Sequence, residues 1–305
     1  MMRRFLLYLS AAAWARGLTT HFFLARNMAR RFIAGETIDE AVQATKALNA
    51  QGLLVSLDYL GESVLQAEET QAVVTSYRTL LQRIQSEGLK AGVSLKLTQL
   101  GLDVTEDLCV TNLCAILEAA RDIPVAIDME SSAYVDRTLR IYRTMRDEYG
   151  YKNVGTVIQS YLYRTSDDMR HLADEGATIR LVKGAYLEPD NVAFPEKADV
   201  DRNFDEVMQA YLAAPPPAYL QIATHDETLI QSAEKRAKEL GLPPERYEFQ
   251  MLYGIRTARQ LELAKAGYQM RIYVPFGEAW YPYFMRRLAE RPANLWFFTQ
   301  SIFRG

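Results

Sequence analysis

The feature of this sequence that most constrains its fold is a unit that repeats from residue 37 onward. Each unit has a short apolar run rich in β-branched residues, then a polar cluster, then a stretch with helical periodicity. Strands that alternate with helices form parallel sheets. Eight runs are predicted to be strands: Gly52–Asp58, Gly92–Leu97, Pro124–Asp128, Val154–Gln159, Thr178–Val182, Tyr219–Ala223, Tyr247–Gln250 and Met270–Val274.

Eight such units predict an α/β fold of the (β/α)8 TIM-barrel type. No linker separates the first four units from the last four, and the tract Pro215-Pro216-Pro217 reads as a turn before a strand. The main rival is a doubly wound open sheet, which normally shows a Gly-rich fingerprint after its first strand, and none is present. We therefore expect a catalytic barrel over residues 37–305, with N-terminal helices packed on it over residues 1–36.

Local patterns support this assignment. Thr37 and Glu40 have the spacing of a capping box, and Thr105 precedes two acids where a helix N-terminus favours negative charge. Parallel strands covered on both faces should be apolar throughout, and Leu181-Val182 and Ile272 fit that expectation.

The N-terminus admits two interpretations. Its basic start and the apolar run Phe5–Trp14 resemble a signal peptide, whereas the arginines that recur beyond this run favour amphipathic helices. Ten apolar residues are too few to span a bilayer, which needs about 20. We expect helices that stay on the protein, and contact with a membrane surface is left open.

Composition excludes several classes of function. The net charge is −3 with acids and bases spread along the chain, so no nucleic-acid partner is expected. Cys109 and Cys114, with three histidines in the whole chain, are too few for a disulfide framework or a Cys- or His-rich metal site. We therefore predict no metal, and the cysteine usage suits a reducing compartment.

Candidate chemistry gathers at the predicted strand ends, which converge on one face of a barrel. Such residues include Asp58, Glu62, Lys96, Asp128, Gln159, Lys183, Thr224, His225, Asp226, Gln250 and Tyr273. A lone Asp or His in such a place is often structural. Lys96 and Arg180 differ because both lie inside apolar runs, where a charge must be paired or must await a ligand.

Two segments could bind an anion. Lys183 and Gly184, beside Arg180, could seat a phosphate or another anionic group because glycine allows close approach to the backbone. Arg286 and Arg287 could form a fork for a carboxylate or phosphate at the barrel mouth. A solvated basic face is the other interpretation of the two arginines.

Together these segments closely resemble the proline dehydrogenase family in its short monofunctional bacterial form. The two most specific stretches are Arg180–Tyr186 and Tyr281–Pro292 within a longer match. All matching stretches occur in family order: Leu57–Glu62, Leu95–Gly101, Asp128–Glu130, Gln159–Arg164, Arg180–Tyr186, Ala223–Asp226, Phe249–Gly254 and Arg271–Pro292.

The resemblance implies a distorted barrel that binds FAD non-covalently and oxidises L-proline to Δ1-pyrroline-5-carboxylate, with electrons passed to a quinone at the membrane. The chain shows no fused aldehyde dehydrogenase domain, so we expect a separate pyrroline-5-carboxylate dehydrogenase to take the product. The expected location is cytoplasmic, or peripheral at the inner face of the membrane.

The resemblance also assigns residues to roles. It implies that Arg286 and Arg287, helped by Lys96, bind the proline carboxylate, and that Glu62 gates the site with Arg286. Asp128 would lie beside the flavin and Lys96, and Arg180 near flavin N5. Tyr186, Leu252 and Tyr273 would surround the pyrrolidine ring, with Tyr273 favouring proline over hydroxyproline. FAD contacts would come from Met129, Gln159, Arg180, Lys183, Gly184, Ala185, Thr224, His225, Gln250 and Glu290.

Two other functions fit the same strand ends. A Schiff-base aldolase would use Lys183 or Lys96 as a strand-end amine in an apolar pocket. A non-catalytic binding barrel is the third interpretation, because a fold does not dictate a function.

Overall fold

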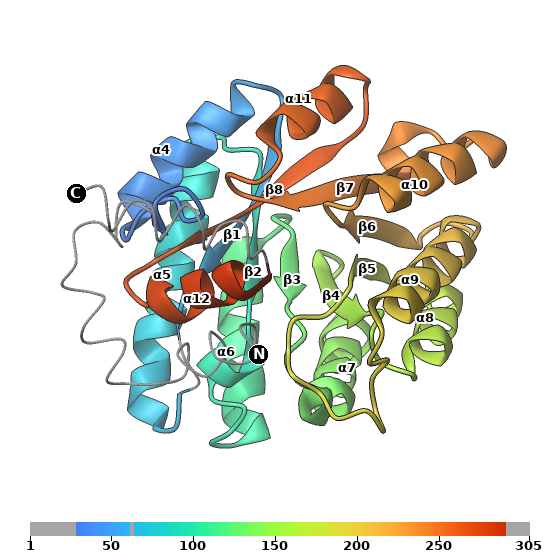
Figure 1. The fold of residues 1–305 in the computed structure, drawn as a ribbon. Helices are drawn as coiled ribbons and strands as arrows, with labels where there is room; N and C mark the ends of the chain where they lie inside the picture. The colour runs from blue at the N-terminus through green and yellow to red at the C-terminus, as the bar shows by residue number, and fades with distance from the viewer. Residues whose placement is uncertain (1–28, 62–63, 291–305) are drawn as a thin grey trace, which may run out of the picture.

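Eight parallel strands close into a barrel in the order in which they occur along the chain (Figure 1). The structure is a computed structural model that describes residues 29–61 and 64–290, with the backbone alone for 286–290. The strands are β1 (Leu54–Tyr59), β2 (Ala91–Leu95), β3 (Val125–Ile127), β4 (Val154–Gln159), β5 (Thr178–Val182), β6 (Tyr219–Ala223), β7 (Tyr247–Leu252) and β8 (Met270–Phe276). Each of the eight predicted strands is present, and β1 pairs with β8 to close the barrel.

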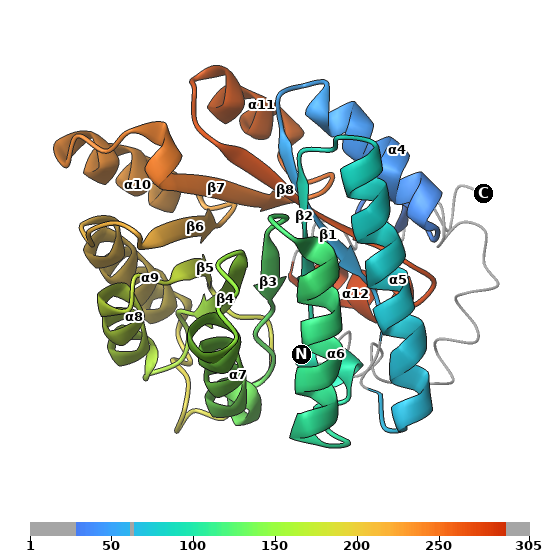
Figure 2. The same cartoon turned by 180° about the vertical axis from the view of Figure 1, so that it is seen from behind.

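Helices cover the outside of this barrel, as Figures 1 and 2 show from opposite sides. They are α4 (Ile38–Asn49), α5 (Ala67–Ser86), α6 (Glu106–Ala120), α7 (Val135–Arg143), α8 (Thr165–Asp174), α9 (Lys197–Leu212), α10 (Glu227–Glu239) and α11 (Thr257–Lys265), and the chain goes on to α12 (Trp280–Glu290). The predicted capping box is present, since the Thr37 hydroxyl accepts from the Glu40 amide at 3.2 Å and the Glu40 carboxylate accepts from the Thr37 amide. Thr105 caps α6 in the expected way.

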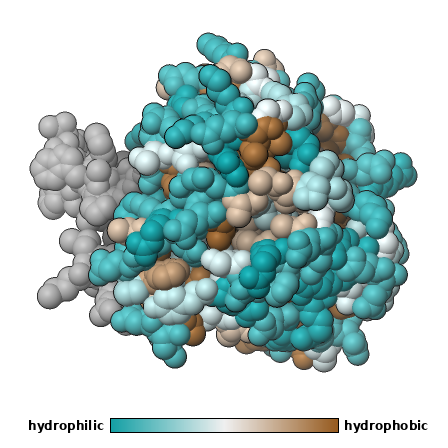
Figure 3. Space-filling model, turned by 90° about the vertical axis from the view of Figure 1, so that its right-hand side faces the viewer, coloured by the Kyte–Doolittle hydropathy of each residue, from teal (hydrophilic) through white to brown (hydrophobic). Residues whose placement is uncertain are grey.

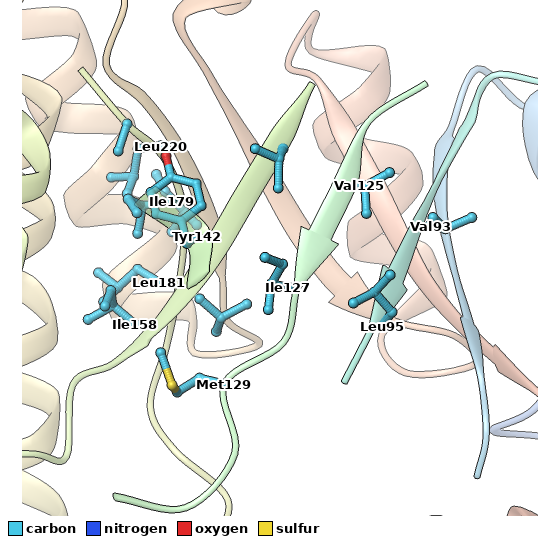
Figure 4. Packing of buried hydrophobic residues seen from close by; sticks show 14 of the residues in the cluster. Val93, Leu95, Val125, Ile127, Met129, Tyr142, Ile158, Ile179, Leu181 and Leu220 are labelled. Atoms are coloured by element: carbon cyan, nitrogen blue, oxygen red, sulfur yellow. The ribbon is translucent and has the colours of Figure 1, made fainter. Parts of the chain in front are cut away.

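The strands alternate between an apolar outer face and a polar inner face. Val93 and Leu95 of β2 and Val125 and Ile127 of β3 belong to the buried apolar core, which also includes residues of the surrounding helices (Figure 4). The inner face carries buried polar side chains: Ser56, Ser94, Arg180, Gln221, Glu248 and Gln250. The prediction that the strands are apolar throughout is therefore wrong. Most of these interior groups are hydrogen-bonded or ion-paired, which offsets the penalty of burying them.

Helix α12 packs at the carboxyl end of the barrel. Its residues Trp280 and Phe284 share a second apolar cluster with Phe32, with Leu60 after β1 and with Ile255 after β7. This helix therefore overlies strand ends, which departs from a regular barrel and agrees with the expected distortion.

The segment 29–36 is bonded to the same region. The Ala34 amide donates to the Pro275 carbonyl at 2.9 Å, and the Trp280 indole N–H donates to Glu36 at 3.2 Å. Gly254 has a φ of 70°, and a Cβ there would lie 1.7 Å from the Arg31 carbonyl oxygen, so only glycine allows this contact. The helices predicted before residue 29 lie outside the described residues.

The surface seen in Figure 3 is mostly hydrophilic, with apolar residues in small scattered groups. Within the described residues, none of the helices has both the length and the apolar character that a bilayer crossing requires.

Candidate active site

Three charged side chains meet at the carboxyl ends of β1, β2 and β3. Asp58 ends the inner face of β1, and only 1% of it is exposed. The Lys96 ammonium lies 3.1 Å from the nearer Asp58 oxygen and 3.4 Å from an Asp128 oxygen. The charge of Lys96 is thus paired twice, which meets the expectation that a charge in an apolar run finds partners.

Arg180 reaches this cluster from β5 on the other side of the barrel. One of its Nη atoms lies 2.6 Å from Asp128 Oδ1, and the other donates to Ser94 at 2.9 Å. The guanidinium also lies over the Tyr273 ring, 5.2 Å from its centroid. Tyr273 in turn donates its hydroxyl to Asp128 Oδ2 at 2.7 Å. Asp128 therefore accepts from Arg180, Tyr273 and Lys96, and it fixes all three.

Burial and neighbouring charges shift the pKa values of three side chains in this network. Desolvation raises the pKa of Asp58 above its usual value, against the opposing effect of Lys96. Burial alone would lower the pKa of Lys96, but the carboxylates of Asp58 and Asp128 outweigh burial and raise it. The pKa of Tyr273 lies well above its usual value because its hydroxyl is desolvated and bonded to a carboxylate. Lys96 therefore stays an ammonium, which is the wrong state for a Schiff-base nucleophile.

Lys183, after β5, is held by carboxylates from two other elements. Its ammonium lies 2.5 Å from Asp201 of α9 and 2.9 Å from Asp226. Asp226 also caps α10 by accepting from the Thr228 amide, as expected of a lone strand-end Asp. An anionic ligand at Lys183 would therefore compete with two carboxylates. Gly184 has a φ of 115°, and a Cβ there would lie 2.4 Å from the Tyr161 ring, so this packing requires the glycine.

His225, which follows β6, is held by hydrogen bonds to Leu252 at the end of β7 and to Arg256 after it. Its Nε2 accepts from the Leu252 amide at 3.0 Å. Its carbonyl accepts from Arg256 at 2.7 Å, and Arg256 also bonds Glu227 at 2.6 Å. Arg256 adopts a left-handed backbone with φ 56°, a strained conformation for a residue with a side chain. Nε2 of His225 is thus occupied by its hydrogen bond with the Leu252 amide.

The other cofactor candidates lie around the same rim. The Gln159 side-chain amide donates to the Glu130 carbonyl at 2.8 Å. Met129, which precedes Glu130 in the chain, is buried. The Thr224 hydroxyl accepts from the Asp226 amide at 3.1 Å. Ala185 and Tyr186 are half-buried in the loop after β5. These residues therefore share the rim at the carboxyl end of the barrel.

Two buried polar atoms in the barrel interior have no hydrogen-bond partner among the described residues. They are Gln250 Oε1, an acceptor, and Arg180 Nε, a donor. Gln250 uses its amide N–H on Glu248 at 2.5 Å, and Arg271 holds both oxygens of that carboxylate. Buried polar atoms are almost always satisfied in folded proteins, so these two indicate water or a ligand.

Several predicted site residues lie outside the described residues. Glu62 is one, and the side chains of Arg286, Arg287 and Glu290 are the others. The backbone at the last three belongs to α12, whose N-terminal turns pack at the barrel mouth. Among the residues that the structure describes, no cluster of His, Cys, Asp and Glu could hold a metal ion.

Sequence reasoning missed part of the network. Ser56 and Ser94 share a hydrogen bond at 2.8 Å and both face Arg180. Taken alone, Asp58 is more typical of a structural residue, and the sequence does not show that it is the closest partner of Lys96. The period of two residues in a strand could have identified these serines. Ser56 and Ser94 each lie two residues before a charged residue at the strand end, so each serine lies on the same inward face of its strand as that charged residue.

Comparison with known proteins gives the family context. The family model described as "Proline dehydrogenase" matches residues 41–300. The chain is 45% identical over 278 residues to "Proline dehydrogenase 1" of Bacillus subtilis, covering 90% of this chain and 91% of the relative. It is 42% identical to "Proline dehydrogenase" of Deinococcus radiodurans over 92% of this chain and 91% of that one.

Solved structures agree with the fold. The crystal structure of proline utilization A from Bdellovibrio bacteriovorus, inactivated by N-propargylglycine, aligns with a TM-score of 0.80 at 26% identity. The alignment covers 90% of this chain and 33% of that longer one.

Proposed function

This chain belongs to the proline dehydrogenase family, and from that premise we propose that it oxidises L-proline to Δ1-pyrroline-5-carboxylate with a non-covalently bound FAD. The main support within the molecule is the network around Asp128, which holds Arg180, Lys96 and Tyr273 at the carboxyl ends of the strands. Active sites of barrels of this type lie at that face.

The residues at this face fit a flavin. The edge of the flavin ring carries an N–H donor and carbonyl acceptors, and Gln250 Oε1 and Arg180 Nε are buried without partners among the described residues. When bound, FAD supplies a ring that accepts a hydride, which no side chain can do. We assign the binding of FAD to Met129, Gln159, Arg180, Lys183, Gly184, Ala185, Thr224, His225, Gln250 and Glu290.

Arg180 is the residue best placed to assist hydride transfer. Loss of a hydride leaves positive charge on the substrate and places negative charge on its acceptor. A guanidinium held rigidly by Asp128 and Ser94 stabilises that negative charge without reorganising during the reaction. Asp128 acts in this scheme by positioning Arg180, Tyr273 and Lys96.

The substrate is held by charge at one end and by shape at the other. We propose that Arg286 and Arg287 bind the proline carboxylate, and that Lys96 joins them because an ammonium has three N–H donors. Tyr186, Leu252 and Tyr273 surround the ring. The hydroxyl of Tyr273 is held on Asp128 at 2.7 Å, and we propose that this fixed ring disfavours hydroxyproline.

A gate would close over the bound substrate. Strands β1 and β8 are paired, so the segments that follow them are neighbours at the barrel mouth. We propose that Glu62, after β1, meets Arg286 of α12 and keeps water away from the reacting atoms.

The proposal extends to partners and location. Electrons would pass to a quinone, and the product to a separate pyrroline-5-carboxylate dehydrogenase. The protein would be cytoplasmic or peripheral at the inner face of the membrane. A Schiff-base aldolase is less well supported because Lys96 and Lys183 are each held by two carboxylates.

The absorption spectrum of the purified protein tests the function. We expect a yellow protein whose flavin bands bleach anaerobically with L-proline and do not bleach with glycine. A colourless protein that also fails to take up added FAD would contradict the proposal. Borohydride trapping with substrate is the control for the aldolase, and it should give no covalent adduct.

A further inference from the structure

The half of the barrel interior away from the charged network contains a cavity of about 240 Å3. It opens beside Lys152 and Asn153, in the loop before β4, at the amino ends of the strands. Its lining includes Ser56, Gly92, Ala126, Gly155, Thr178, Arg180, Tyr219, Gln221 and Arg271. The space exists because three adjacent strands, β2, β3 and β4, place only Gly92, Ala126 and Gly155 at this level.

The cavity reaches the network at the active site from below. Ser56 and Arg180 line the cavity and also belong to the network. Ser56 is bonded to Ser94, and Arg180 to Ser94 and Asp128. Arg180 is only 4% exposed, and its Nε–H has no partner among the described residues. One end of this cavity is therefore formed by a side chain whose guanidinium is bonded directly to the central carboxylate.

Charge balance favours water as the occupant. The charge of Arg180 is compensated by Asp128 and that of Arg271 by Glu248, so the inner part of the lining, away from Lys152 at the opening, has little net charge to attract a buried anion. Apart from Lys152 at the opening, the remaining polar lining consists of hydroxyl and amide groups, which suit water. One water takes about 30 Å3 in the liquid, so a cavity of this size holds several.

The reaction gives such water a role. Proline carries an ammonium in solution, and the nitrogen must lose a proton before a hydride can leave the neighbouring carbon. Under the proposed function, substrate and cofactor would cover the carboxyl end of the barrel during this step, so a second route for the proton would be useful. Asp58 belongs to the network that would receive this proton. The charged and titratable side chains that interact with Asp58 there are Lys96, Asp128, Tyr273 and Tyr77.

We propose that this cavity is a water-filled passage through which the network around Asp128 exchanges protons with solvent at the amino end of the barrel. The inference rests on the proposed function. An N–H bond of the substrate breaks, its electron pair stays on nitrogen, and the proton passes to a carboxylate oxygen of the network. The network then gives one proton to the water in the cavity. Hydroxyls can both donate and accept: Tyr273 is bonded to Asp128, and Ser56, which is bonded to Ser94, lines the cavity.

Cysteine labelling tests whether solvent reaches the cavity. Ala126 faces the cavity, whereas its neighbour Ile127 faces the outer apolar core. In FAD-loaded protein that carries Cys114→Ser, we expect Ala126→Cys to react with a small charged methanethiosulfonate and Ile127→Cys to stay unreacted. The rate at Ala126→Cys should be unaffected by a proline analogue bound at the mouth. An unreactive Ala126→Cys in folded protein would overturn the passage.

A filled cavity tests the role in proton release. Proline is mixed anaerobically with FAD-loaded enzyme, and flavin bleaching and a pH-indicator dye are followed together. In the parent and in Ile127→Leu, the proton should appear as fast as the bleaching. In Ala126→Leu the bleaching should persist while the proton appears about tenfold more slowly or worse. Prompt proton release from Ala126→Leu would overturn the proposal. Because labelling needs no turnover, absence of proline oxidation would count against the proposed function alone.

Discussion

Replacing Asp128 by alanine removes the acceptor that three side chains share. Arg180 loses a contact of 2.6 Å, Tyr273 one of 2.7 Å and Lys96 one of 3.4 Å. Lys96 keeps Asp58 as a partner, but Arg180 keeps only serine hydroxyls as hydrogen-bond partners and has no other carboxylate within bonding distance among the described residues.

The expected loss follows from the burial of Arg180. Breaking a buried ion pair by removing one partner destabilises a protein by about 3–5 kcal/mol, because a buried charge stays uncompensated. The unfolding entropy of a chain of 305 residues is large, so this loss should lower Tm by only about 5–8 °C. A displaced guanidinium should lower kcat/KM by about a hundredfold or more, since small misplacements at an active site have that effect. We therefore expect activity to fall more than stability.

Thermal melts and kinetics on the same sample decide the outcome. The control is Asp167→Ala, which removes an exposed ion pair with Arg170 and should change stability by less than about 1 kcal/mol. Asp128→Asn, which keeps an oxygen acceptor, should retain more stability than Asp128→Ala. Normal turnover of the folded fraction of Asp128→Ala, whatever its Tm, would refute the reasoning and make Asp128 purely structural.

Four further outcomes are expected. Arg287→Met should raise the KM for proline about ten- to hundredfold through loss of a charge-assisted contact, and an unchanged kcat/KM in steady-state assays would make this arginine a solvated surface group. Glu62→Ala should weaken proline capture with FAD affinity and Tm unchanged, and added salt should lower kcat/KM more in the parent; equal salt responses would exclude the gate. The pKa of Lys96 is raised in the folded state, so its ion-pair stabilisation is complete below the unfolded pKa of about 10.4 and is lost as pH rises beyond it. Denaturant titrations should accordingly show the stability difference between the parent and Lys96→Met narrowing above that pH, and a constant difference would count against the pairing. Arg121 has a φ of 53° at the C-cap of α6, so Arg121→Gly should raise Tm by about 1–2 °C, whereas a lower Tm would mean that its side chain contributes more than the strain removes.

The positions of the strands were predictable because each depends on a local pattern. A run such as Thr178–Val182 follows a stretch of helical periodicity and ends at a polar cluster, and its bounds in the structure are those predicted. The capping residues Thr37 and Thr105 act on amides three residues away, so the sequence contains the whole interaction.

Pairing within the site was less predictable because it depends on the closed barrel. Nothing local associates Lys183 with Asp201, which lies on the far side of a long loop, in α9. Arg180 meets Ser56 across the barrel interior at a separation of 124 residues. The polar inner face could have been predicted from Ser56 and Asp58, which alternate with apolar residues along the strand. The apolar residues of the outer face were instead the stronger part of the pattern. The tertiary structure decides which carboxylate pairs with which lysine or arginine.

The link between segment 29–36 and α12 affects how the protein can be shortened. A chain trimmed to the predicted barrel boundary at residue 37 would keep all eight strands. It would lose the bond from Trp280 to Glu36, a contact that joins positions 244 residues apart, and the packing of Phe32 on Phe284. The arginines of α12 would then sit on a helix with one side unsupported. A minimal version that keeps its substrate affinity must therefore start before the barrel does.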